Sequence, residues 1–213
     1  MKNKSRVTRF LLIGVVIAGL AGCAIANPWS QSNDVGKGRS DWNTARGYQQ
    51  STANPLDNPT YPQPSVTYDE SSYTIEEMLT MAIQDETLAR QEYESILEEY
   101  GDIRPFTNII QAEVKHIEML EPLFAAYKIT IPEDDAIDHV VLPETLEESY
   151  AIGVQAEVNN IAMYERFLEE DVPEDVQDVF QRLMSDSYKH LEAFARHVEG
   201  NSGRNGRSNG RSS

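Results

Sequence analysis

The sequence has almost no cysteine and lacks the motifs of several large enzyme classes. Its 213 residues include one cysteine, Cys23, so no disulfide can form within the chain and a four-cysteine metal site is excluded. There is no phosphate-binding glycine loop, no serine motif of the hydrolase type and no strand-like alternation of apolar and polar residues. These absences favour an all-α protein whose chemistry would depend on carboxylates and histidines.

Positive charge is scarce in the central part of the chain. Residues 69–200 contain 32 of the 35 acidic residues but only eight of the 18 basic ones, which gives this part a formal charge of −24. Such a surface repels nucleic acid and attracts cations, so we expect no nucleic-acid partner. For most of these acidic residues, the simplest interpretation is a solvated exterior.

The beginning of the chain is typical of a secretion signal. Basic residues precede the apolar run 10–20, which is short for a membrane span but suits a signal peptide. The run ends in Leu20-Ala21-Gly22-Cys23, which resembles the bacterial lipobox and implies cleavage before Cys23 and lipid on that cysteine. We therefore expect an exported, membrane-anchored lipoprotein of the cell envelope, on its periplasmic or extracellular face. Cleavage after Ala26, giving a soluble exported protein, is the alternative.

Composition divides the chain into four parts. After the signal peptide (1–22), residues 23–68 are rich in Asn, Ser, Gln, Pro and Gly and predict a disordered tether. Residues 69–200 form the predicted folded domain. Residues 201–213 are a Gly/Ser/Asn/Arg tail that we also expect to be disordered.

Apolar residues at three- and four-residue spacing predict four helices in the folded domain. The first should run over 74–100, because Thr74 and Glu77 fit a capping box and Gly101 fits a C-terminal stop. The second should begin near Pro105, with Pro122 kinking it or marking its last turns. The third and fourth are expected over 143–170 and from about 173 to Gly200.

The segment between the second and third helices is long enough to determine the topology. Residues 128–142 read as an irregular connection, and about fifteen extended residues cover roughly 50 Å, more than the roughly 38 Å of a 25-residue helix. The sequence therefore predicts an all-α four-helix bundle with one long crossover between helices 2 and 3.

Acidic and imidazole groups occur on the apolar faces of these helices. Glu113 and His116 are one turn apart on the second helix, so both can reach one ion from the same side. Near the middles of their helices lie Glu86, Glu113, Glu157 and Ser187, with His116 and His190 one turn away. Antiparallel helices bring their middles to one level, so we expect these positions to converge. Carboxylates in a dry interior need a proton or a cation, and this donor set without sulfur favours iron or manganese. In the alternative, these groups are only hydrogen-bonded, for which Tyr93 and Tyr164 are available.

The residues around these positions resemble a known family. Asp85-Glu86, Glu113-Val114-Lys115-His116, Ala156-Glu157 and the segment 187–194 are similar to the ferritin-like superfamily, and specifically to its domain of unknown function 2202 (DUF2202) family. The resemblance covers about 73–198. It implies a metal site with a carboxylate on each of helices 1 and 3 and a Glu-x-x-His on each of helices 2 and 4. The implied ligands are Glu86, Glu113, His116, Glu157 and His190.

Two positions depart from that pattern. Ser187 stands where the resemblance implies a glutamate on the fourth helix, and Asn160 replaces an expected acidic residue on the third. With three carboxylates for the whole centre, we expect one or two ions of iron or manganese per chain. Tyr93, Asn160, Tyr164 and Ser187 are expected to surround the ligands.

The resemblance implies an oxidoreductase that oxidises Fe(II) or reduces peroxide, without a four-cysteine rubredoxin domain. The departures leave open an alternative, a non-enzymatic metal-binding or envelope interaction bundle with a degenerate metal site. The expected partners are the membrane, through lipidated Cys23, and a second copy of the chain in a homodimer; the sequence identifies no electron donor.

Overall fold

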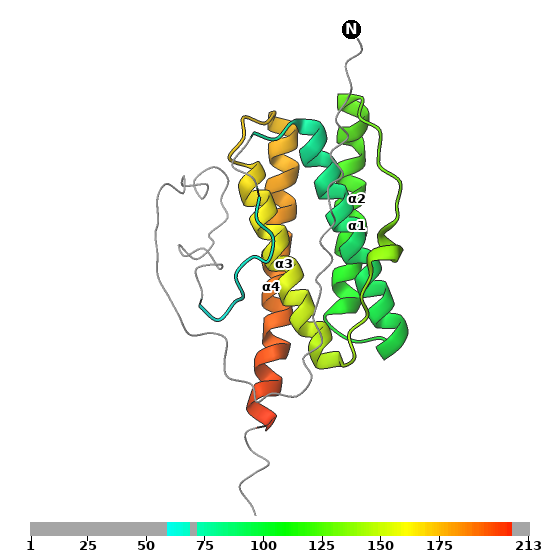
Figure 1. Cartoon of the computed structure of the whole chain (residues 1–213), viewed down its shortest axis with the longest axis vertical. Helices are drawn as coiled ribbons and strands as arrows, with labels where there is room; N and C mark the ends of the chain where they lie inside the picture. The colour runs from blue at the N-terminus through cyan, green and yellow to red at the C-terminus, as the bar shows by residue number, and fades with distance from the viewer. Residues whose placement is uncertain (1–58, 69–71, 206–213) are drawn as a thin grey trace, which may run out of the picture. The chain divides into compact units, whose positions relative to one another are not determined.

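The computed structural model describes residues 59–68 and 72–205, and the regular structure within these ranges is entirely helical (Figure 1). There are four α-helices, α1 (Ile75–Tyr100), α2 (Phe106–Tyr127), α3 (Leu146–Phe167) and α4 (Glu174–Asn205), and one 3-10 helix, η3 (Ala136–His139). The predicted all-α class, with four helices and a long connection between the second and third, is confirmed. The chain divides into two compact units, one containing residues 73–146 and the other containing 147–205 with the segment 59–68.

The ends of α1 follow from local sequence. The Thr74 side chain accepts a hydrogen bond from the backbone N–H of Glu77 (3.2 Å), and the Glu77 carboxylate accepts one from the backbone N–H of Thr74 (2.9 Å). This is the predicted capping box, which satisfies two donors that a helix start leaves open. At the other end Gly101 has φ +82°, a conformation that glycine adopts without strain, and its N–H bonds to the Leu97 carbonyl.

The second helix, α2, packs against α1 in the same unit. It begins after Pro105 and ends at Lys128, which adopts the left-handed conformation (φ +57°). Pro122 lies inside the helix, in its last turns. This agrees with the expectation that it would mark the last turns of the helix. The ring of Tyr93 on α1 meets the ring of Phe106 edge-on at 5.5 Å, and both side chains are fully buried. Such burial is what holds the pair together, at about 1.5–3 kcal/mol for each large apolar side chain.

The connection from α2 to α3 is attached to α1 by two polar contacts. Arg90 forms an ion pair with Asp134 at 3.2 Å, and the Tyr100 hydroxyl donates to the Pro143 carbonyl at 2.7 Å. Between these points η3 turns the chain and buries Ala136. The sequence predicted an irregular connection here and missed this single turn of 3-10 helix.

In the second unit, α3 and α4 approach closely where α3 has a glycine. A Cβ atom at Gly153 would lie 2.8 Å from ring carbons of Phe194, closer than such atoms normally come. Glycine therefore allows the fully buried Phe194 ring to lie against the α3 backbone. Further along, Tyr164 and Phe167 of α3 pack on Phe180 of α4, with ring centroids 5.4 and 5.6 Å apart.

Two helices differ in their bounds from the sequence prediction. The third helix spans Leu146–Phe167, so it is three residues shorter at each end than the predicted 143–170. Helix ends are hard to predict because they depend on which terminal carbonyl and N–H groups find hydrogen-bond partners. The fourth begins at Glu174 as expected but continues past Gly200 to Asn205, so residues 201–205 of the predicted disordered tail are helical. A glycine inside a helix disfavours it by only about 1 kcal/mol, so Gly200 does not stop α4.

Part of the predicted tether makes specific contacts with α3. The backbone N–H of Ser65 donates to Asn159 Oδ1 (2.8 Å), and Asn159 Nδ2 donates to the Ser65 hydroxyl (2.9 Å). The Tyr68 ring meets Phe167 edge-on with centroids 6.4 Å apart. The predicted signal peptide, Cys23 and the predicted tether up to residue 58 lie outside the described residues. None of the helices within 59–68 and 72–205 is long and apolar enough to cross a membrane.

Candidate metal centre

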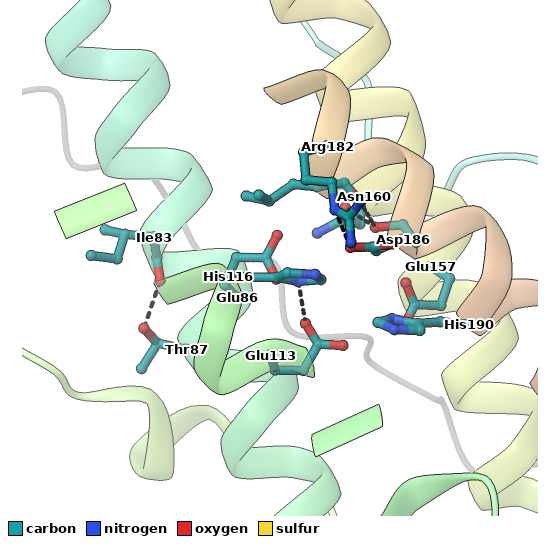
Figure 2. A network of polar contacts seen from close by, with 12 residues as sticks. Ile83, Glu86, Thr87, Glu113, His116, Glu157, Asn160, Arg182, Asp186 and His190 are labelled. Atoms are coloured by element: carbon teal, nitrogen blue, oxygen red, sulfur yellow. Dashed lines mark hydrogen bonds and ion pairs between the residues drawn. The ribbon is translucent and has the colours of Figure 1, made fainter. Parts of the chain in front are cut away.

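The unit formed by residues 73–146 contains a buried cluster of two carboxylates and an imidazole. Glu86 comes from α1, and Glu113 and His116 come from α2. The Nδ1 atom of His116 lies 2.9 Å from Oε2 of Glu86 and 2.9 Å from Oε2 of Glu113 (Figure 2). All three residues are at most 2 % exposed.

Helix geometry explains why these side chains meet. Glu113 and His116 are three residues apart, so they lie one above the other on the buried face of α2. Glu86 lies on the buried face of α1, in the same stripe as Ala82 and Tyr93. The structure therefore brings together the three predicted ligands of this unit. The Glu-x-x-His spacing led us to expect this of Glu113 and His116, and the place of Glu86 near the middle of its helix led us to expect it there.

Burial changes the acid–base behaviour of Glu86. Desolvation raises its pKa from 4.5 to about 8, His116 acts in the opposite direction by hydrogen bonding, and the negative charge of Glu113 adds to the rise. At neutral pH the metal-free cluster therefore retains a proton on Glu86. A divalent cation would replace that proton and stabilise both carboxylates, so the donor set fits a metal ion. One ligand atom from each of the three residues lies within 4.8 Å of the others.

The second unit contains a buried acid–imidazole pair. Glu157 of α3 is 4 % exposed and His190 of α4 is 8 % exposed. Oε1 of Glu157 and Nδ1 of His190 are 3.4 Å apart, an ion-pair distance that is long for a strong hydrogen bond. The structure thus brings together the two remaining predicted ligands within their own unit. That all five ligands belong to one centre stays a prediction.

The two positions that depart from the expected ligand pattern contact each other. The Ser187 hydroxyl on α4 donates a 2.7 Å hydrogen bond to Asn160 Oδ1 on α3, and the Leu183 carbonyl lies 3.1 Å from the same hydroxyl. Ser187 is 2 % exposed and Asn160 is 5 % exposed. The buried Ser187 hydroxyl therefore has a neutral hydrogen-bond partner and needs no ion. The sequence marked both positions as departures but did not predict this bond.

The two tyrosines expected near the ligands are fully buried. The ring of Tyr93 contacts the ring of Phe106. The ring of Tyr164 contacts the rings of Phe180 and Phe167. Their predicted role beside a metal stays a prediction.

Sequence reasoning overlooked one titratable residue on α1. Burial, and to a lesser extent the charge of Asp85, raise the pKa of Glu92 from 4.5 to about 7. Glu92 directly precedes Tyr93 and follows Asp85 by seven residues, a spacing that returns to nearly the same side of a helix. The seven-residue spacing of Asp85 and Glu92 was the one sequence feature that could have indicated two neighbouring carboxylates here.

Comparison with known proteins identifies relatives but no function. Residues 75–208 match the model of a family described as "Uncharacterized protein domain (DUF2202)". The chain is 27 % identical over 129 residues to the uncharacterized protein MJ0754 of Methanocaldococcus jannaschii, covering 53 % of this chain and 69 % of that one. It also resembles the crystal structure of hypothetical protein MJ0754 from Methanococcus jannaschii, with a TM-score of 0.56 and 22 % identity over 65 % of this chain and 87 % of that one. The structural likeness concerns the fold alone.

Proposed function

The chain belongs to the DUF2202 family, and we propose that it is an exported metal-binding protein that holds iron or manganese at Glu86, Glu113 and His116. The observation that carries this proposal is the contact of His116 Nδ1 with two buried carboxylates at 2.9 Å each. Isolated buried charges are strongly unfavourable, and a divalent cation compensates two carboxylates at once.

The donor types support the choice of metal. Carboxylate oxygen and imidazole nitrogen suit iron and manganese, and the cluster contains no thiolate that would favour a structural zinc site or copper(I). We propose Glu157 and His190 as further ligands because they form a similar buried pair on α3 and α4. With Ser187 and Asn160 neutral and bonded to each other, one tightly held ion per chain is the expected minimum and a second would be held more weakly.

The proposed chemistry is oxidation of Fe(II) or reduction of peroxide. A bound iron or manganese ion would supply the redox step. The chain's own residues would bind and orient that ion, and the low exposure of Glu86, Glu113 and His116 would exclude bulk water. Glu86 would release its proton as the ion binds, since its raised pKa leaves it protonated in the metal-free protein.

A second candidate function has a specific observation in its favour. Ser187 and Asn160, which are hydrogen-bonded to each other, occupy two positions where acidic residues were expected. The interior therefore has fewer carboxylates, which favours a bundle that binds metal without turning over a substrate. Such a protein would retain the ion and show no metal-dependent consumption of O2 or peroxide.

The deciding experiment is elemental analysis of the full chain, prepared without a histidine tag, after anaerobic loading with Fe(II) or Mn(II) and desalting. We expect one or two ions per chain, with loss of at least one in Glu113→Gln and no loss in the matched control Glu98→Gln, whose side chain is exposed. O2 and peroxide consumption by the loaded protein then separates the two functions. Retention of no metal by the wild-type chain would overturn both.

A further inference from the structure

The unit formed by residues 73–146 contains a pocket that none of the proposed metal ligands lines. It lies between α1, α2 and the connection that carries η3, and its volume is about 400 Å³. Figure 1 shows this connection running along the α1–α2 pair, with η3 partway along it. The volume is in the range of sites that bind small molecules.

The pocket and the buried cluster of Glu86, Glu113 and His116 lie on different faces of α1 and α2. Thr87, Val114 and Ile117 line the pocket, and each directly follows a cluster residue, Glu86, Glu113 and His116 respectively. One residue along a helix rotates the side chain by about 100°, so neighbouring positions point in different directions. Figure 2 shows Thr87 turned back onto its own helix, where its hydroxyl donates to the Ile83 carbonyl (2.6 Å).

The apolar part of the lining is aliphatic and incompletely covered. It includes Ile83, Val114, Ile117 and Ile131, and no Phe, Tyr or Trp. Val114 is 38 % exposed and Ile131 is 44 % exposed, which places both among the exposed large apolar side chains of the described residues. An aliphatic ligand in the pocket would cover this surface and so remove apolar area from water.

The polar part of the lining is strongly acidic. Five carboxylates contribute to it, Glu118, Glu121, Glu133, Asp134 and Asp135. Opposite charge comes from Arg90, which already contacts the carboxylates of Glu94 and Asp134 at 3.2 Å each. The one lining histidine, His139, lies 3.6 Å from Asp135. All five carboxylates are exposed, and together they outnumber the one arginine, so the lining has a net negative charge at neutral pH. This charge favours a positively charged ligand over an anion.

We propose that this pocket binds small aliphatic primary amines in their ammonium form. The ammonium group has three N–H donors for the carboxylates, and the alkyl chain would lie on the aliphatic side chains. The lack of aromatic rings in the lining disfavours quaternary ammonium ligands, which proteins usually hold against aromatic faces. This site is separate from the metal centre and does not depend on the function proposed there.

The test is saturation-transfer difference NMR on the full chain, with hexylammonium as the probe. Hexanol and hexanoate serve as comparators because they keep the alkyl chain and change only the charge. We expect hexylammonium to bind with a dissociation constant on the order of 1 mM, hexanol at least about fivefold more weakly, and hexanoate not at all. Equal binding of hexylammonium and hexanol, or no binding of hexylammonium, would overturn the proposal.

Charge and shape are then tested separately by substitution. The triple variant Glu118→Gln, Glu121→Gln, Glu133→Gln should weaken hexylammonium binding about tenfold. The matched control Glu98→Gln, Glu99→Gln, Asp102→Asn removes as much charge from exposed positions outside the pocket and should change binding less than twofold. Val114→Phe, which adds bulk at a partly exposed lining position, should also weaken binding. Equal effects of the two triple variants would show a general charge effect and contradict a defined site.

Discussion

The Ser187 hydroxyl on α4 and the Oδ1 atom of Asn160 on α3 are joined by a buried 2.7 Å hydrogen bond. These are the two positions where the resemblance to ferritin-like proteins implies acidic residues. Because the Ser187 hydroxyl and the Asn160 amide oxygen are both neutral and are joined by this bond, neither position adds a buried charge that a cation or a proton would have to compensate. The two positions that depart from the ligand pattern expected from sequence are therefore joined to each other.

Restoring a carboxylate at this position should change both metal content and stability. Ser187→Glu places a carboxylate three residues before His190, which is the same spacing as Glu113 and His116. We expect about one more bound ion per chain by elemental analysis. In the metal-free protein, the new buried carboxylate should lower the free energy of unfolding by about 1–3 kcal/mol, measured by urea denaturation.

The control is Ser187→Ala, which removes the hydrogen bond without adding a ligand. It should cost about 1 kcal/mol of stability and leave the metal content unchanged. Equal metal content in Ser187→Glu and wild type would contradict the interpretation that Ser187 limits the number of ions.

Glu86 should make the stability of the metal-free protein depend on pH. Its pKa is raised in the folded state to about 8 from an ordinary value of 4.5, so between these values the folded chain holds a proton that the unfolded chain has lost. The free energy of unfolding should therefore decrease as pH rises from about 5 to 8, and level off above that range. Glu92, whose pKa is raised to about 7, contributes in the same direction. Urea denaturation at several pH values in the presence of a chelator measures the slope.

Single substitutions separate the two contributions. Glu86→Gln and Glu92→Gln should each reduce the slope, since an amide does not titrate. Saturation of wild type with Mn(II) should remove the part due to Glu86, because a bound cation replaces its proton. A slope that Glu86→Gln leaves unaltered would show that Glu86 titrates normally.

Gly153 should be intolerant of a methyl group. In a helix interior, replacement of glycine by alanine normally stabilises by about 1 kcal/mol. Here the added Cβ would lie 2.8 Å from the ring of buried Phe194, so we expect Gly153→Ala to lower the free energy of unfolding by about 1–3 kcal/mol. Thermal and urea unfolding followed by circular dichroism measure the effect.

The matched comparison is Gly153→Ala combined with Phe194→Leu, which removes the opposing ring. The two changes should be non-additive, so that Gly153→Ala costs less in the Phe194→Leu background than in wild type. A stabilising Gly153→Ala in the wild-type background would contradict close packing at this point.

Cys23 should carry the lipid that attaches the protein to the membrane. In a bacterial host, metabolic labelling with a palmitate analogue should mark the wild-type chain and leave Cys23→Ser unlabelled, because the thiol is the acylation site that the lipobox resemblance implies. The wild-type chain should fractionate with membranes and Cys23→Ser should not form the lipidated product. Unlabelled wild type would favour the alternative, cleavage after Ala26.

Local sequence predicted the four α-helices, but not the 3-10 helix η3, the two ends of α3 or the end of α4. Thr74, Glu77 and Gly101 located the ends of α1, since caps depend on residues a few positions apart. The three- and four-residue apolar spacing identified the helices and the buried faces on which Glu86, Glu113 and His116 lie. The three-residue spacing of Glu113 and His116 also predicted that they would meet, because that spacing alone puts both on one side of a helix.

Contacts between distant parts of the chain were decided only by the tertiary structure. The side-chain hydrogen bonds that join Ser65 to Asn159 and Ser187 to Asn160 were not predicted, because helix periodicity does not encode which side chains meet. The same holds for the fit of Phe194 against Gly153 and for the acidic, aliphatic pocket beside η3. Helix periodicity predicts which face of an element is buried, but which residues meet across that face depends on how the helices and connections pack together.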